Sequence, residues 1–241
     1  MDAISQALLV AQGKAAALFA EVVDRGMVSA GKLESELTAE IHALSQSRFG
    51  LRRHWHKRIA RSGPNTLLTY HDPDADRRIT EDDIVYLDFG PVFDAWEADF
   101  GRTYVVGRDP SKHRLVGDLA DAFRRGKEFY RQSPSLTAGQ LYDYVAALAA
   151  NYGWEFGAQT AGHLIGHFPH ERLPQDPKHF SIRQGNSVPL REPDANGVPR
   201  HWILEIHFID RAREIGGFYE ELLTVDAADV ADAAQSGRVL G

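Results

Sequence analysis

The sequence predicts an α+β fold in which helices cover a strongly curved antiparallel sheet. Two observations support this prediction. Apolar residues recur at helical spacing in four segments, and strand-like runs follow each pair of these segments. The order is therefore two helices and a hairpin, repeated once. We expect one domain over residues 1–241 with two pseudo-symmetric halves, about 1–107 and 108–225.

The first half begins with two predicted helices. In residues 3–24 the apolar side chains lie on one helical face and Gly26 ends the pattern, and a second helix is predicted over about 32–47. Residues 54–61 are interpreted as a strand, and SGPNT at 62–66 as a turn. Residues 71–83 form a polar connection. Strands are then predicted over about 84–92 and 96–107.

The second half repeats this order. Helices are predicted over about 115–130 and 138–152, and strands over about 201–210 and 216–225. Residues 172–200 hold five prolines and are predicted to form a long irregular loop. Loops of this length commonly serve as lids or contact surfaces. Residues 227–241 are predicted to form a short helix with a loose tail.

Composition excludes several classes of function. The 241 residues are 43% hydrophobic and carry a formal net charge of -7, a balance that argues against nucleic acid or an anionic membrane as partner. The absence of cysteine excludes disulfides, thiolate metal sites and a cysteine nucleophile. The N-terminus does not have the pattern of a signal peptide, and we see no apolar run near the ~18 residues of a membrane span. We expect a cytoplasmic protein.

Four acids occupy matching places in the two predicted hairpins. A turn centred on Phe93–Asp94 would place Asp88 opposite Asp99, and a turn centred on Ala212–Arg213 would place Glu205 opposite Glu220. Like charges that face each other among apolar residues are destabilising. Two divalent cations would cancel the four negative charges. The alternative is two harmless pairs of surface acids.

A histidine-rich segment accompanies these acids. TAGHLIGHFPHE, residues 160–171, holds His163, His167 and His170 among glycines. Carboxylates together with one imidazole suit Mn²⁺, Co²⁺, Fe²⁺ or Zn²⁺. The alternative is a solvated, histidine-rich loop.

Together these residues resemble the group of methionine aminopeptidases, Xaa-Pro aminopeptidases and prolidases, whose fold is called the pita-bread fold. The resemblance covers about residues 1–225. DFGRT at 99–103 is similar to the group's Asp-x-x-Arg-Thr, and GHLIGHFPH is similar to its Gly-His-x-Ile-Gly-x-x-x-His segment. The resemblance implies that this single domain is catalytic and that it has five metal ligands, which are Asp88, Asp99, His163, Glu205 and Glu220.

The resemblance also implies a mechanism. Two divalent ions, with Mn²⁺ favoured over Co²⁺, Zn²⁺ or Fe²⁺, would share a hydroxide that attacks the first peptide bond of a small peptide. Glu205 would pass a proton to the leaving nitrogen. His170 and His71 would be catalytic residues that bind the substrate and stabilise the developing oxyanion, and His71 precedes Asp88 by 17 residues.

Two further residues are assigned roles from their positions. Arg102 is expected to orient Asp99 or another ligand carboxylate. His207 lies two residues after Glu205, so the same face of the strand could bring it to the substrate, with a structural histidine as the alternative. Glu221 should point to the opposite face.

The sequence departs from the group's pattern at three positions. Ile206 replaces the usual proline after the fourth ligand, Leu164 replaces a glycine, and Gln159 stands where Xaa-Pro enzymes often have histidine. The metal site is therefore better supported than a preference for proline. Two alternatives stay open, a metal-dependent hydrolase of a non-peptide C–N amide bond and a non-catalytic binding module. Residues 172–200 could close over the pocket or form a homodimer contact.

Overall fold

The computed structural model describes residues 2–170 and 181–225. All four predicted helices are present, as α1 (Ala3–Asp24), α2 (Glu34–Phe49), α3 (Pro110–Gln132) and α4 (Ala138–Tyr152), together with a 3₁₀ helix, η1 (Gly63–Leu67). The strands are β1 (Ile59–Ser62), β2 (Ile84–Phe89), β3 (Val92–Phe93), β4 (Trp96–Glu97), β5 (Phe100–Val105), β6 (Glu155–Phe156), β7 (Thr160–Ile165), β8 (Ser181–Arg183), β9 (His201–Asp210) and β10 (Ile215–Leu222).

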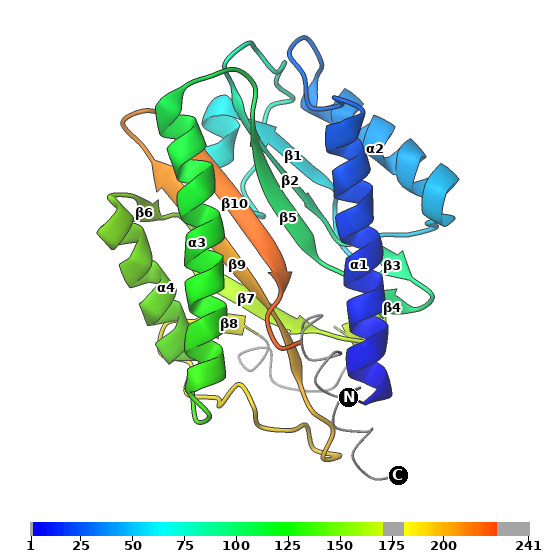
Figure 1. The fold of residues 1–241 in the computed structure, drawn as a ribbon, viewed down its shortest axis with the longest axis vertical. Helices are drawn as coiled ribbons and strands as arrows, with labels where there is room; N and C mark the ends of the chain where they lie inside the picture. Colours follow the sequence, from blue (N-terminus) through cyan, green and yellow to red (C-terminus); the bar gives the residue numbers. More distant parts are fainter. Residues whose placement is uncertain (1, 171–180, 226–241) are drawn as a thin grey trace, which may run out of the picture.

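The helices lie over one face of a continuous antiparallel sheet. The strand order is β1-β2-β5-β10-β9-β7-β8, with β6 also paired to β9. Helices α1 and α3 cross the front of the sheet, with α2 and α4 on their outer sides (Figure 1). Strand β5 of the first half pairs with β10 of the second, where Gly101 is opposite Glu220. The two halves therefore meet along the β5–β10 pairing.

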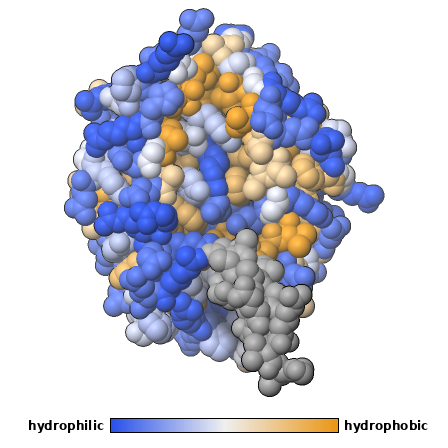
Figure 2. Space-filling view, viewed as in Figure 1, coloured by the Kyte–Doolittle hydropathy of each residue, from blue (hydrophilic) through white to orange (hydrophobic). Residues whose placement is uncertain are grey.

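Each half has its own hydrophobic core beneath its helices. In the first half Leu18 and Leu37 of the helices are fully buried with Leu87 of β2. In the second half Leu115 of α3 is buried with Leu204 of β9. The space-filling view shows polar side chains along the outer sides of the helices, and a mixture of apolar and polar ones between α1 and α3 (Figure 2).

Helix α1 is anchored at its start and along one face. The side chain of Asp2 accepts a hydrogen bond from the backbone N–H of Ser5, which caps the helix N-terminus. By length and composition alone α1 meets the criteria for a membrane-crossing helix, which the sequence analysis did not expect. Its Leu8, Leu18 and Val22 are nevertheless buried in the fold, as in the core helix of a globular domain.

Three predictions about strands need correction. Of the strand predicted over 54–61, only Ile59 onward is paired in β1. In the first hairpin Asp88 pairs with Gly101, so it does not face Asp99, because the turn is centred on Asp94–Ala95. Strands β6 and β7 were not predicted, and β8 lies within the predicted irregular loop. Residues 172–180 of that loop and the C-terminal residues 227–241 lie outside the described residues.

Candidate metal centre

The five predicted metal ligands converge on one face of the sheet, from four strands and one strand junction. Asp88 lies on β2, Asp99 between β4 and β5, His163 on β7, Glu205 on β9 and Glu220 on β10. The second hairpin has the predicted register, in which Glu205 is directly opposite Glu220. Asp99 reaches the centre from the junction before β5 rather than from a ladder position.

His163 links the acids of the two halves. Its Nε2 lies 3.1 Å from Asp99 Oδ2 and 3.4 Å from Glu205 Oε1. Ligand atoms of Asp99, His163 and Glu220 all lie within 4.8 Å of one another. Since Asp99 and Glu220 are almost fully buried, these carboxylates are held together away from water.

His56 is a site residue that the sequence analysis did not identify. Its Nε2 lies 3.0 Å from Asp99 Oδ1 and 3.5 Å from Asp88 Oδ1, so these three residues form a second cluster of potential ligands. The local sequence gave only a weak signal: in the strand predicted over residues 54–61, either His54 or His56 could line the pocket, and we favoured a solvated strand edge for both. The proximity arises from a long-range approach between residues 54–56 and 90–91.

Burial and mutual repulsion disfavour four ionised acids without cations. Burial, together with the neighbouring carboxylates, raises the pKa of Asp88 and of Glu205 to about 7. The same causes raise the pKa of Glu220 well above its ordinary value. Burial also acts to raise the pKa of Asp99, but the imidazoles of His56 and His163 outweigh it and lower that pKa.

The donor set suits divalent cations. Asp88 Oδ1 and Glu220 Oε2 are buried and have no hydrogen-bond partner among the described residues. Buried carboxylate oxygens without a partner are rare in folded proteins, and a bound ion is one of the standard explanations. Oxygen-rich ligands with imidazole match the preferences of Mn²⁺, Fe²⁺, Co²⁺ and Zn²⁺.

Comparison with known proteins agrees with this geometry. The sequence profile of "Metallopeptidase family M24" matches residues 6–198. The chain belongs to the M24 family. The Xaa-Pro dipeptidase of Pyrococcus furiosus is 28% identical over 159 residues, which are 63% of this chain and 44% of that protein. The M24 chain thus spans less than half the length of this curated relative.

Solved structures show the same fold. The prolidase from Pyrococcus furiosus superposes with a TM-score of 0.67 at 21% identity, covering 89% of this chain and 58% of the other. The methionine aminopeptidase from Rickettsia prowazekii gives a TM-score of 0.67 at 18% identity, covering 90% of this chain and 95% of the other. The pita-bread fold predicted for this M24 chain is confirmed.

His170 lies beside the M24 centre and is held by a buried acid. Glu97 is 1% exposed, and its carboxylate accepts hydrogen bonds from the His170 backbone N–H at 3.1 Å and from His170 Nδ1 at 2.5 Å. The rings of His163 and His170 are stacked, with centroids 5.9 Å apart. The indole of Trp55 packs against both rings.

His71 is exposed in a turn near the centre. Its ring packs on Tyr70, whose ring in turn contacts His56. The buried guanidinium of Arg61 donates to the carbonyls of Leu68, Thr69 and Asp72 and so fixes the turn that carries His71. Among the described residues, no hydrogen bond, ion pair or ring contact joins His71 to one of the five predicted metal ligands. Its position is compatible with a residue at the rim of the site.

The structure places His207 and Arg102 away from the predicted roles. His207 is 3% exposed, and its Nε2 donates to the backbone carbonyl of Thr66 at 2.8 Å, which matches the structural alternative. Arg102 was expected to contact a ligand carboxylate. It instead donates to the backbone carbonyl of Glu220 at 2.9 Å and pairs with Glu221.

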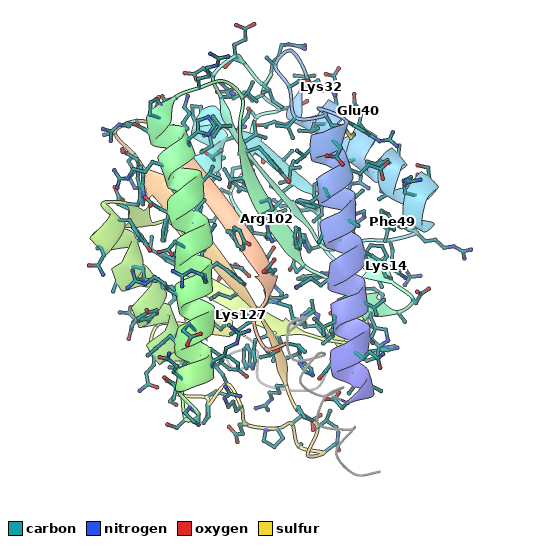
Figure 3. All side chains as sticks on the ribbon, in the orientation of Figure 1. Lys14, Lys32, Glu40, Phe49, Arg102 and Lys127 are labelled. Atoms are coloured by element: carbon teal, nitrogen blue, oxygen red, sulfur yellow. The ribbon has the colours of Figure 1, made fainter. Side chains whose placement is uncertain are left out.

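Glu221 and Arg102 show which face carries the metal centre. Arg102 lies between α1 and α3, on the helix-covered face of the sheet (Figure 3). Successive side chains on a strand alternate between faces, so Glu221 shares that face and Glu220 points to the other. The orientation predicted for Glu221 is therefore confirmed, and the centre lies on the face opposite α1 and α3. His167 is exposed, and its ring packs on Trp96.

Proposed function

We propose that this M24 chain is an aminopeptidase or dipeptidase that hydrolyses the N-terminal peptide bond of a small peptide, Xaa-Pro substrates included, with two divalent metal ions. The observation that carries the proposal is the convergence of buried acids from both halves with an imidazole around Asp99. Mn²⁺ is the ion we favour, and Co²⁺, Zn²⁺ and Fe²⁺ fit the same donors. The names of the relatives and the acidic composition support a peptide rather than nucleic acid as partner, and we propose a cytoplasmic location.

The chain's own residues have separable tasks in this reaction. When bound, two divalent ions lower the pKa of water and polarise the scissile carbonyl. Asp88, Asp99, His163 and Glu220 hold the ions, while Glu205 also moves a proton to the leaving nitrogen. His170, held through Nδ1 by Glu97, positions the substrate carbonyl on which negative charge develops. His71 positions the substrate at the rim.

A substrate panel tests the activity. Purified protein supplied with Mn²⁺ or Co²⁺ is given Xaa-Pro dipeptides, methionyl peptides and acylated amino acids, and released amines are measured. We expect turnover of one of the peptide classes. Turnover of acylated amino acids alone would replace the proposal with a non-peptide amide hydrolase, and no turnover at all would favour a binding module.

Metal analysis tests the centre independently of the substrate. We expect up to two divalent ions per chain in the wild type and loss of both in Asp99→Ala, because Asp99 faces both ligand clusters. The matched control is Asp94→Ala, which removes an exposed acid at the tip of the same hairpin. Unchanged metal content in Asp99→Ala would refute the ligand assignment.

A further inference from the structure

We propose that His56 is a sixth metal ligand, whose Nε2 binds the ion held by Asp88 and Asp99, so that each of the two ions takes one imidazole. The inference rests on the proposed binuclear centre. It adds a residue that lies outside the five-ligand pattern, on a segment that precedes the first strand of the sheet.

The first argument is the matching geometry of the two histidines. His163 Nδ1 lies 2.6 Å from the backbone carbonyl of Leu164, and His56 Nδ1 lies 2.6 Å from that of Lys57. A carbonyl only accepts hydrogen bonds, so each Nδ1 carries a proton. Metal-binding histidines commonly donate their second ring N–H to such a partner, which fixes the tautomer and the ring orientation.

The second argument is where the two Nε2 atoms point. His163 Nε2 lies 3.1 Å from Asp99 Oδ2, and His56 Nε2 lies 3.0 Å from Asp99 Oδ1. The two imidazoles thus address opposite oxygens of one buried carboxylate. A carboxylate that bridges two ions presents one oxygen to each. If Asp99 bridges the two ions, His163 would therefore lie beside one ion and His56 beside the other.

The third argument is the oxygen that lacks a partner. Asp88 Oδ1 is buried without a hydrogen-bond partner among the described residues, and it lies 3.5 Å from His56 Nε2. A cation between these atoms and Asp99 Oδ1 would satisfy all three groups. With His56 absent, this ion would have carboxylate ligands alone, a set that suits Mg²⁺ or Ca²⁺ as well as transition metals.

The surrounding chain is shaped to admit this imidazole. A Cβ atom at Gly90 would lie 2.1 Å from His56 Cδ2 and 2.4 Å from Nε2, so only glycine leaves room there. The adjacent Trp55 is tied to the same hairpin, because its backbone N–H donates to Gly90 O at 2.8 Å and its Nε1 donates to Ala98 O at 3.1 Å. These contacts hold His56 against the carboxylates.

The alternative is that His56 only forms an ion pair with Asp99 and Asp88. X-ray absorption of Co²⁺-loaded protein distinguishes a ligand role of His56 from an ion-pair role, because scattering from imidazole rings gives the average number of histidine ligands per ion. We expect one imidazole per ion on average in the wild type with two ions bound. An average of half an imidazole per ion would mean that only one of the two ions has a histidine ligand, and this result alone would overturn the inference.

Variants give a second readout by calorimetric titration with Co²⁺ and Mn²⁺. In His56→Ala we expect one site to persist and the other to weaken by at least about tenfold to a hundredfold, the range seen even for groups that only support a ligand. His54→Ala is the matched control, because His54 lies two residues earlier on the same segment, beside His42 and Phe89. Its two sites should keep wild-type affinity.

The outcomes distinguish this inference from the proposed function. Two sites of unchanged affinity in His56→Ala would overturn the inference and leave the peptidase proposal standing. A wild type that binds no ion would overturn both. If thermal melts show that His56→Ala does not fold, His56→Gln replaces it, because glutamine retains volume and polarity.

Discussion

At the scale of single residues, the site contains histidines in opposite electrostatic environments. Burial alone would lower the pKa of His56, but the carboxylates of Asp99 and Asp88 raise it to about 10. For His207 burial is the largest effect and lowers its pKa to about 4, because no acid among the described residues lies in direct contact with it to outweigh burial. The acids that contact His56 lie far from it in the chain, so the local sequence does not show the different environments of the two histidines. This is why His56 was missed and His207 was assigned to the substrate.

His207 predicts a specific acid sensitivity. Between pH 6.5 and about 4 the unfolded chain takes up a proton that folded His207 does not. Its contribution to the free energy of unfolding is therefore full above pH 6.5 and declines as the pH falls through this window. His207→Gln, which can still donate to Thr66, should show a shallower decline in urea titrations across this range. The exposed His113→Gln should match the wild type, and an unaltered decline in His207→Gln would contradict the prediction.

Glu97 predicts a separate effect on the segment that carries His170. Glu97→Gln replaces one acceptor oxygen with a donor amide, so one of its buried N–H partners, Gly166 or His170, loses its acceptor. We expect a loss of about 1–3 kcal/mol in the free energy of unfolding, with faster hydrogen exchange around residues 166–170. Denaturant melts and exchange mass spectrometry measure these. Glu81→Gln, at an exposed position, is the control, and slow exchange retained in Glu97→Gln would refute the role.

At the scale of elements, the sequence predicted the helices and strands that have a strong apolar periodicity, but it predicted the strand register only in part. The four helices and strands β9 and β10 were found because their apolar patterns are long and regular. β7 was missed because TAGHLI is short and contains glycine, and its pairing with β9 is a tertiary effect. The turn predicted for the first hairpin is one residue too early. In the structure Asp94 and Ala95 form the turn with positive φ angles, which their residue types did not indicate.

Gly162 makes β7 sensitive to a single methyl group. It has a φ of +135°, and a Cβ there would lie 2.0 Å from the Ile203 backbone oxygen. Gly162→Ala should therefore push β7 away from β9, lower the melting temperature and weaken metal binding through the adjacent His163. Gly117→Ala is the matched control, because its Cβ meets nothing within 4 Å. In the interior of α3 it should stabilise by up to about 1 kcal/mol. Equal effects of the two variants would contradict this account.

At the scale of the whole molecule, ions should act on global stability. The proposed ligands come from both halves and have no common centre in the unfolded chain, so ions that bind the folded state would stabilise it by mass action. A site at 100 times its Kd contributes about 2.7 kcal/mol. The melting temperature should rise with added Mn²⁺ in the wild type and in Asp94→Ala, and remain constant in Asp99→Ala. A wild-type melting temperature that is indifferent to Mn²⁺ and to chelators would contradict the prediction.

Because β5 pairs with β10, the two halves of the chain could associate as separate fragments. Of the six proposed metal ligands, His56, Asp88 and Asp99 precede α3 in the chain, whereas His163, Glu205 and Glu220 follow it. A polypeptide cut in the β5–α3 connection would yield two pieces that each carry three donors. Reassembly of such pieces would be concentration-dependent and promoted by divalent ions, with chelation driving them apart.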